Sequence, residues 1–331
     1  MRAELKNSLI GLGGFAVGGL LLWLAVKQVD RQQLGQLIAS FEVRYMLAAC
    51  GIYWLGMVIR SSRWHCLLQE LQAMTWWSVA EVLVVGYGAN NLLPARLGEF
   101  ARAEYAKRRF DLSRSLVLGT ILSERLLDLI VVLGCLVGGL ALGALASHSS
   151  FDSTIKGIVL NGMILVAVVG LAIKFLGVRL RTPGALAKWR IMREIYRGIS
   201  SLNLRSASVV TGLSSVVWMC EAGSLWLTFK ALHLSLSLAQ TLLLVGASSL
   251  STLLPTAPGY LGSYQLVFVL AMAAYGIPEA AGLVASLAVQ IFMFGSVTMA
   301  ALLFYFTRTY VTLKRQAQPS LRAPQERAAH G

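Results

Sequence analysis

Apolar runs long enough to cross a lipid bilayer recur along the whole length of this chain. A helix that crosses the hydrocarbon core needs about 20 apolar residues. Six segments reach or approach that length: Ser8–Val26, Tyr45–Ile59, Ser115–Ala146, Ile155–Phe175, Ala207–Phe229 and Ala280–Phe306. Only 13% of the residues are charged, about half of the roughly 25% that a soluble domain uses to cover its surface. The chain is therefore predicted to be an all-α polytopic membrane protein with about six full transmembrane helices.

The charged residues gather in the connections between these runs, and their sign predicts orientation. The formal net charge is +14, and basic residues dominate three stretches: Arg96–Arg114, Lys174–Arg205 and the tail from Arg308. Cytoplasmic loops carry such an excess, so we expect these stretches and both termini on the cytoplasmic side of a bacterial inner membrane. No polar stretch is long enough for a folded basic domain, so no nucleic-acid partner is expected.

Three shorter apolar segments, Val79–Leu93, Leu238–Leu254 and Leu261–Tyr275, do not read as full crossings. The first two stop at a proline. If Val79–Leu93 crossed, the basic stretch after it would face outward, against the charge rule. A re-entrant hairpin that enters and leaves on the cytoplasmic side removes the conflict. The same reasoning makes Leu238–Tyr275 a hairpin entered from the periplasm, so the sequence predicts two oppositely oriented re-entrant helical hairpins.

The two predicted hairpins also resemble each other. Residues 83–98 read LVVGYGANNLLPARLG and residues 244–259 read LVGASSLSTLLPTAPG. Chance similarity is one explanation, and an inverted repeat, which places broken helices opposite one another in transporters, is the other. We expect one transmembrane domain over 1–310, with half-repeats at roughly 45–175 and 207–306. A basic amphipathic cytoplasmic segment, 176–206, would join them, and 311–331 would be a disordered cytoplasmic tail.

The first break concentrates polar groups where an apolar helix ends. Non-helical backbone at membrane depth is tolerated only where it is buried in protein or lines a wet cavity. Pro94 lacks a backbone donor, and Gly98 would permit the turn that follows. The candidate lipid-binding residues here are Asn90, Asn91, Pro94, Arg96, Gly98, Glu99 and Arg102. A plain loop at the membrane edge is the alternative.

The second break carries no charge but repeats the prolines and glycines of the first. Its candidates are Pro255, Pro258, Gly259, Gly262 and Gln265. Exposed backbone groups and side-chain amides would supply its ligand contacts. A tight periplasmic turn would explain the same residues without a binding role.

Glu124, Arg125 and Asp128 lie inside an otherwise apolar span. Each charge within a span costs at least about 2.5–3.5 kcal/mol on insertion scales and generally faces a cavity or a partner. Their spacing of three and four residues lets them share one helix face. They act either as a clamp between helices or as a ligand or proton site.

Arg60 and Arg63 are candidate partners for that acidic cluster, as is Arg96. Pairing would place their helices together. Arginines next to Trp64 are also typical of ordinary anchoring at the cytoplasmic interface, and that interpretation gives Arg60 and Arg63 no binding role.

No motif for ATP hydrolysis or hydrolytic chemistry occurs in the chain. GxxxxGK[ST], GxSxG and HExxH are absent, and these are the patterns that phosphate cradles, serine hydrolases and zinc proteases use. Four cysteines and four histidines are dispersed without metal-ligand spacing. We therefore predict no metal, no cofactor and no catalytic residue.

Three ordered motifs carry a family resemblance. The runs GYGANNLLPARLGEFARAEYAKRR, SERLLDLIVVL and LLPTAPGYLGSYQ, with Arg-x-x-Arg-Trp at 60–64, resemble the lysylphosphatidylglycerol synthase transmembrane region, also called the flippase-like domain family. The resemblance covers nearly the whole chain, and the candidate residues fall on its motifs. It implies a domain that moves an aminoacylated phospholipid between leaflets in its best-known members. Those members add a cytosolic aminoacyl-transferase domain, and since nothing of that kind follows Arg308, no synthase activity is expected.

The resulting hypothesis is a lipid translocase that moves a phospholipid or related lipid without its own ATPase. Its partners would be membrane lipids with an anionic headgroup, and lipid-synthesis enzymes are further candidates. Two rival classes stay open. One is an integral-membrane transferase acting on a lipid-linked substrate, and the other is a non-catalytic scaffold of a lipid- or glycolipid-synthesis complex.

Overall fold

A computed structural model describes residues 2–27, 29–144, 190–199, 204–254 and 256–317, with Gly157, Leu160, Asn161 and Ile164. All regular secondary structure in these parts is helical. Three helices are long and apolar enough to cross a membrane: Val43–Gln69, Arg114–Gly143 and Glu279–Val311. The prediction of an all-helical membrane protein is thus confirmed. The predicted span Ile155–Phe175 lies outside the described residues apart from isolated positions.

The N-terminal helices lead into a long helix, α3. α1 spans Arg2–Val26, and α2 spans Arg31–Ala39, a short helix that the apolar runs did not predict. α3 runs over Val43–Gln69, well past the predicted end at Ile59. The extension carries Arg60 and Arg63 into the protein interior, where both are buried.

The first hairpin consists of α4 (Trp76–Leu92), the 3₁₀ turn η1 (Pro94–Arg96) and α5 (Gly98–Phe110). α4 packs against α5. Leu93 adopts extended backbone, with φ −106° and ψ 140°, as the residue before a proline prefers. Arg96 takes a left-handed conformation with φ 56°, which is uncommon for a residue other than glycine.

Gly98 was expected to permit the turn after Pro94, and that expectation is wrong, because Arg96 takes the left-handed conformation instead. A Cβ atom at Gly98 would lie 2.3 Å from the backbone nitrogen of Asn90 and 2.4 Å from its Oδ1. At a second contact between these helices, the side chain of Arg102 would lie 2.7 Å from a Cβ at Gly86. The glycines therefore let α4 and α5 approach closely at two levels.

Three further helices complete the middle of the chain. α6 spans Arg114–Ala144, α8 spans Arg190–Ile199 and α9 spans Leu204–Lys230. Of the predicted amphipathic segment 176–206, the structure describes α8 and the first three residues of α9, and α8 packs against α6. The hydroxyl of Ser113 donates to Glu194 on α8 (2.7 Å).

The second hairpin consists of α10 (Leu238–Ser251), η2 (Pro258–Tyr260) and α11 (Ser263–Ala274). Its break is longer than the first. Gly259 and Gly262 have φ values of 66° and 93°, so here the glycines do serve the turn. Pro255 lies outside the described residues.

The last helices follow almost without interruption. α12 spans Glu279–Ala288, the π-helical turn η3 spans Val289–Phe294 and α13 spans Gly295–Ala317. π-turns inside α-helices are frequent at functional sites. α13 continues past the predicted start of the tail at 311, and residues 318–331 lie outside the described part.

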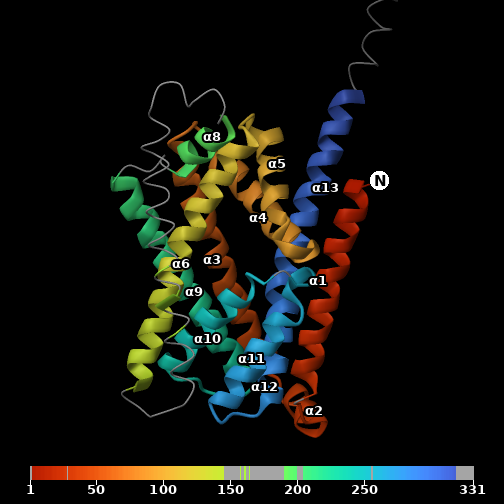
Figure 1. The fold of residues 1–331 in the computed structure, drawn as a ribbon, viewed down its shortest axis with the longest axis vertical. Coiled ribbons are helices and arrows are strands. Elements are labelled where there is room, and N and C mark those ends of the chain that lie inside the picture. Colours follow the sequence, from red (N-terminus) through yellow and green to blue (C-terminus); the bar gives the residue numbers. More distant parts are fainter. Residues whose placement is uncertain are drawn as a thin grey trace, which may run out of the picture.

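The two hairpins approach from opposite ends and meet near the middle of the molecule (Figure 1), where η1 contacts η2. α3 packs along α9, and each is 27 residues long. A shift of 161 residues, the separation of Arg60 and Glu221, maps α3 onto α9. α4 of the first half packs against α13 of the second, and in the same way α10 of the second half packs against α6 of the first. The order of elements from α3 to α6 thus matches that from α9 to α13.

The largest buried apolar cluster connects the two halves of this arrangement. It draws on α3, α4, α9, α11 and α12, and its large members include Trp64, Leu83, Phe229, Phe268 and Met272. The rings of Phe229 and Phe268 stack with centroids 6.3 Å apart. Since lipid tails are as apolar as these side chains, close packing and polar contacts rather than exclusion of water hold such helices together.

Replacing Gly98 with alanine is expected to destabilise the first hairpin by about 1–3 kcal/mol, the usual cost of overpacking. The methyl group would overlap the backbone of Asn90, which cannot rotate away. Thermal unfolding of the purified protein in detergent measures the effect.

The matched control is Gly134→Ala on α6, where a Cβ would meet no atom within 4 Å. This change should leave stability unchanged or raise it slightly, because alanine favours a helix over glycine by up to about 1 kcal/mol. Equal unfolding temperatures for the two variants would contradict the close approach described for Gly98.

Candidate functional site

Arg63 of α3 lies at the centre of a buried network of charges. Its side chain is only 1% exposed. The guanidinium holds Asp128 through two contacts, Nη1 to Oδ1 (2.5 Å) and Nη2 to Oδ2 (3.2 Å). It also donates to Glu124 (3.4 Å) and to the hydroxyl of Ser214 (2.9 Å), while the indole of Trp218 donates to Asp128 (3.2 Å). One arginine therefore ties α3 to α6 and α9.

Arg102 of α5 forms a second arm of the network. Its side chain is 3% exposed, and Nη1 lies 2.8 Å from Oε2 of Glu124. The guanidinium also lies over the ring of Trp64, 3.6 Å from the centroid, a favourable cation–π contact. Its Nε and Nη2 are buried without a hydrogen-bond partner. Glu124 thus bridges two arginines from different helices.

Arg125 and Arg96 extend the network to the point where the hairpins meet. Nε of Arg125 donates to Glu99 (2.8 Å) and its Nη1 lies 3.8 Å from Asp128. The same Glu99 oxygen lies 3.9 Å from Nη1 of Arg96. Arg96 donates to the backbone carbonyl of Thr252 (2.9 Å) and to its hydroxyl (2.5 Å). Arg96 therefore joins the tip of the first hairpin to the second.

Arg60 forms a separate ion pair between α3 and α9. Its Nη2 lies 2.8 Å from Oε2 of Glu221, and its guanidinium lies within 6 Å of the rings of Tyr53 and Tyr87 (5.7 and 5.8 Å to the centroids). Arg60 and Glu221 are 161 residues apart in the sequence, which is the same shift that relates α3 to α9.

The interfacial-anchor interpretation of the Arg60–Trp64 segment is wrong. Trp64 is completely buried and its indole donates to Thr120 (3.2 Å). Arg63 pairs with the acidic cluster, which confirms the alternative that places these helices together. The physical reason is that these arginines find carboxylate partners inside the protein. They therefore do not need the membrane surface to compensate their charge.

The buried and half-buried charges of this network do not cancel. Among the residues that the structure describes, five arginines (Arg60, Arg63, Arg96, Arg102 and Arg125) face four carboxylates (Glu99, Glu124, Asp128 and Glu221), which leaves one positive charge in excess. Arg96 and Arg125 are the most accessible of the five, with side chains 21% and 28% exposed. An anion that reaches the junction of the hairpins would meet these two first.

The polar residues at the first tip have unequal environments. The amide of Asn91 donates to the carbonyl of Phe294 (3.0 Å) and to the hydroxyl of Thr298 (3.0 Å), so it holds α4 to α13. Asn90 is buried, and its Oδ1 has no hydrogen-bond partner. Pro94 begins η1 and ends the run of α4.

At the second tip, two glutamines satisfy freed backbone groups. The side-chain oxygen of Gln265 accepts from the N–H of Gly262 (2.7 Å), and its amide donates to Gln290 (2.5 Å). Gln290, within the π-helical turn, donates to the carbonyl of Gly259 (2.8 Å). Pro258 opens η2. The candidates Pro258, Gly259, Gly262 and Gln265 therefore stabilise the non-helical segment between α10 and α11.

Sequence reasoning missed several members of this site. Thr252, Ser214 and Trp218 were not singled out, and no local signal marks them, because their partners lie on other helices. Outside this network, Glu81 was missed as well, although it is an acid within an apolar helix and the rule that found Glu124 applies to it. Within the described parts, no three His, Cys, Asp or Glu side chains are placed to hold a metal ion.

Near its C-terminal end, α5 is tied to the start of α6. Glu104 accepts hydrogen bonds from Arg108 and Arg114. These hydrogen bonds, first the one from Arg114 and then the one from Arg108, lower the pKa of Glu104 to about 2. The carboxylate therefore stays ionised at physiological pH, and this contact does not respond to physiological changes of pH.

Comparison with known sequences places the chain in a family. A sequence model of the lysylphosphatidylglycerol synthase TM region matches residues 11–301. The chain belongs to this family. The match spans every helix of the charge network, so the family domain contains both hairpins and the pairs between them.

Two archaeal relatives in this comparison are also membrane proteins. A UPF0104 membrane protein of Methanocaldococcus jannaschii is 26% identical over 192 residues, which cover 55% of this chain and 78% of the relative. A UPF0104 membrane protein of Pyrococcus horikoshii is 25% identical over 305 residues, which cover 83% of this chain and 89% of the relative. The similarity to the second relative therefore extends over most of both chains.

The Arg60–Glu221 pair predicts a non-additive effect on stability. Glu221→Leu alone leaves a buried, uncompensated arginine and should cost about 3–5 kcal/mol. Arg60→Met combined with Glu221→Leu should recover much of that loss, because a buried pair can be replaced by apolar side chains at little cost.

Thermal unfolding of the single and double variants in detergent measures the coupling energy. Arg44→Gln is the control, since Arg44 is an exposed arginine near the start of the same helix. Additive losses from the two single changes would show that the pair does not act as a unit.

Proposed function

We propose that this protein is a lipid translocase that moves a phospholipid or related lipid across the membrane without an ATPase of its own. One observation carries the proposal. In the described part of the chain, an arginine network with one positive charge in excess reaches the junction of two helical hairpins, and its two most accessible members, Arg96 and Arg125, lie there. A phosphate-bearing headgroup is the anion that a membrane offers in quantity.

In the proposed membrane arrangement, the two hairpins are re-entrant and enter from opposite sides. Six full spans accompany them, with both termini in the cytoplasm of a bacterial cell and the chain in its inner membrane. We also propose that α3–α6 and α9–α13 form an inverted repeat. The equal lengths of α3 and α9, the shared Leu-Leu-Pro and the matching helix contacts support this.

Arg96 and Arg125 would hold the phosphate through charge-assisted hydrogen bonds. Both already share Glu99, at 3.9 and 2.8 Å. A phosphate and the ionised Glu99 carboxylate would therefore compete for the same two guanidinium groups.

The buried members of the network have a different role in this proposal. Arg102 and Arg63 are almost inaccessible and pair with Glu124 and Asp128. They would position the helices that carry Arg96 and Arg125 rather than touch the lipid. Asn90 is buried and its Oδ1 has no partner, so it would orient a headgroup only after a movement that exposes the inside of the first hairpin.

The test is lipid movement in proteoliposomes that contain fluorescent phospholipids in both leaflets, with a membrane-impermeant quencher outside. Wild-type protein should expose the inner-leaflet probe rapidly. Arg96→Ala and Arg125→Ala should slow this at least about tenfold, because each removes hydrogen bonds to a charged group worth about 1.5–3 kcal/mol. The Glu99→Gln variant should still move lipid, since the change removes only the carboxylate that competes with the phosphate for Arg96 and Arg125.

Arg108→Gln serves as the control, because Arg108 is 72% exposed and lies outside the network. Movement at the wild-type rate in both Arg96→Ala and Arg125→Ala would overturn the proposal. Chemical conversion of a labelled lipid without movement would favour a membrane transferase. Stable co-purification with lipid-synthesis enzymes, together with insensitivity to these changes, would favour a scaffold.

A further inference from the structure

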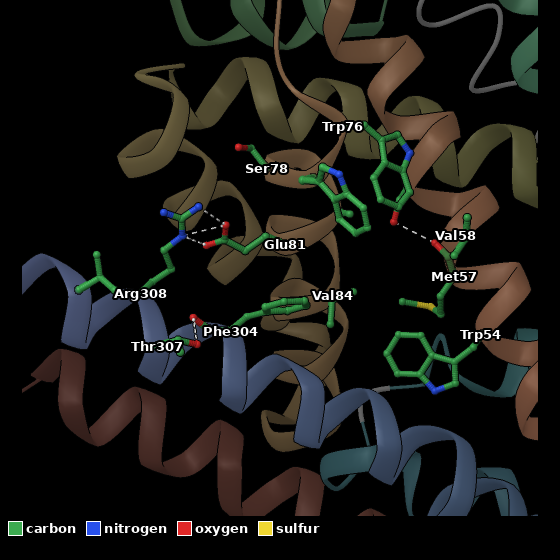
Figure 2. Close-up of a pocket in the computed structure, with 14 residues that line it drawn as sticks. Trp54, Met57, Val58, Trp76, Ser78, Glu81, Val84, Phe304, Thr307 and Arg308 are labelled. Carbon is green, nitrogen blue, oxygen red and sulfur yellow. Dashed lines mark hydrogen bonds and ion pairs between the residues drawn. The ribbon is translucent and has the colours of Figure 1, made fainter.

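A groove lies between α3, α4 and α13. Its volume is about 480 Å³, within the roughly 300–1,000 Å³ typical of ligand pockets. Figure 2 shows Trp54 and Met57 of α3 on one side of it, Phe304 of α13 on the other and Val84 of α4 between them. These side chains give the groove a mainly apolar wall.

A second groove, of about 510 Å³, lies between α6, α9 and α10. The described residues that line it are apolar or carry only a hydroxyl, a thiol or an indole N–H. The first groove is lined by the early part of α4 and the second by the early part of α10. Since α4 and α10 begin at opposite ends of the molecule (Figure 1), the grooves lie in opposite halves.

Equivalent positions of the two halves line the two grooves. The shift of 161 residues that maps α3 onto α9 also relates their lining residues. All four α3 residues that line the first groove have counterparts on α9 that line the second: Trp54, Met57, Val58 and Ser61 correspond to Ser215, Trp218, Met219 and Ala222. The same shift relates the lining residues of α4 to those of α10: Trp77, Ala80 and Glu81 correspond to Leu238, Thr241 and Leu242. The grooves are thus a repeated feature of the fold.

Charge is not common to the two grooves. Glu81 lines the first groove, and its Oε2 lies 2.9 Å from Nη2 of Arg308. The equivalent position in the second groove is Leu242. Similar size and an apolar wall are what the grooves share. A ligand that fits both would therefore be recognised by its hydrocarbon part and not by the charge of its headgroup.

Large apolar side chains that line the grooves are exposed. In the first groove these include Val58, Trp77 and Phe304, and in the second Met219 and Leu238. Exposed apolar side chains on a membrane protein face lipid tails, which are as apolar as they are. Both grooves therefore open sideways to the bilayer.

The inner wall of each groove contacts the buried charges. The sulfur of Met57 lies 3.9 Å from Nη1 of Arg60. Its equivalent, Trp218, donates from the indole to Asp128 (3.2 Å). A molecule in either groove would thus lie between the bilayer and a charged side chain of the polar core. That position fits an amphipathic lipid, whose chain is apolar and whose headgroup is polar.

We propose that the two grooves are equivalent sites for an acyl chain of a bilayer lipid, one in each leaflet. The chain binds by shape, along Val84 and Phe304 in the first groove and along Trp226 and Leu242 in the second. The assignment to two leaflets rests on the proposed function, in which the hairpins enter from opposite sides. In that function the grooves hold the tails in the bilayer while the headgroup reaches the charge network.

A second copy of the chain does not explain both grooves. Two copies in one membrane keep the same orientation, so a twofold axis that relates them runs along the membrane normal. The axis that relates inverted repeats lies in the membrane plane instead. A contact between copies at one groove is therefore not repeated at the other, whereas lipid is present in both leaflets.

Photolabelling of the full chain in liposomes tests the assignment, with a phosphatidylcholine that carries a diazirine in its acyl chain. Peptide mapping by mass spectrometry should find residues 77–84 and 238–242 labelled more strongly than Leu47. Leu47 is an exposed α3 residue that is not among the described lining residues of either groove. Phosphatidylglycerol with the same photoreactive chain should give the same pattern, because the chain and not the headgroup is recognised.

Matched substitutions address the two grooves separately. Val58→Trp fills part of the first groove and should remove most labelling of α4 while that of α10 is unchanged. Met219→Trp, at the equivalent position, should do the reverse. Leu47→Trp places the same ring outside both grooves and should change neither. Ala222→Trp is a second variant for the second groove, and the unfolding temperature of each variant checks the fold.

Equal labelling of Leu47 and of the groove residues would show boundary lipid only and overturn the proposal. Labelling of one groove without the other would also overturn it, because the equivalence would then not extend to binding. A photoreactive residue at position 58 that crosslinks to a second copy in place of lipid would show that protein covers the first groove.

The same liposomes separate these sites from the proposed transport activity. Arg96→Ala should be labelled like the wild type whether or not the protein moves lipid. Groove labelling without lipid movement in the wild type would overturn the proposed function alone. Lipid movement with uniform surface labelling would overturn the groove assignment alone.

Discussion

The ion pairs of Arg63 with Asp128 and Glu124 are the interaction on which the rest of the structure depends. A charge in the bilayer interior costs several kcal/mol unless a partner neutralises it, and Arg63 is 1% exposed. Its partners stand on α6, and its hydrogen bond to Ser214 reaches α9. Because removing one member would strand the others in a low-dielectric interior, the pairs require α3, α6 and α9 to pack in one arrangement.

The hairpin tips impose a second requirement, which is the pairing of freed backbone groups. A break in a helix leaves N–H and C=O groups without partners in the helix itself, and such groups need other partners when they are buried. Gln265, Gln290 and Asn91 supply those bonds from side chains. Arg96 adds a bond from the first tip to the carbonyl of Thr252 near the second. Since Arg96 also belongs to the charge network, the tips and the network form one connected polar core.

Some of this core could be predicted from sequence, and the reason is physical. Glu124, Arg125 and Asp128 are conspicuous because charge is costly in an apolar span, and Pro94 because proline ends a helix. The role of Gly98 was predicted wrongly, since a glycine at a turn and a glycine at a close helix contact look alike in one dimension. Only the position of Asn90 across the hairpin distinguishes them. Trp64 was misassigned for a similar reason, because a Trp–Arg pair at the membrane interface and one buried in the protein look the same in sequence.

The sequence by itself determined that this chain is helical, lies in a membrane and contains two related breaks, because apolar length, charge frequency and proline position are local properties. Tertiary structure alone decided which carboxylate each arginine meets. The partners of Arg63 lie 61 and 65 residues away and that of Arg60 lies 161 away. It also decided that α13 closes the groove of the first half and α6 that of the second. Contacts between distant segments depend on how helices pack, and no local pattern of residues specifies that packing.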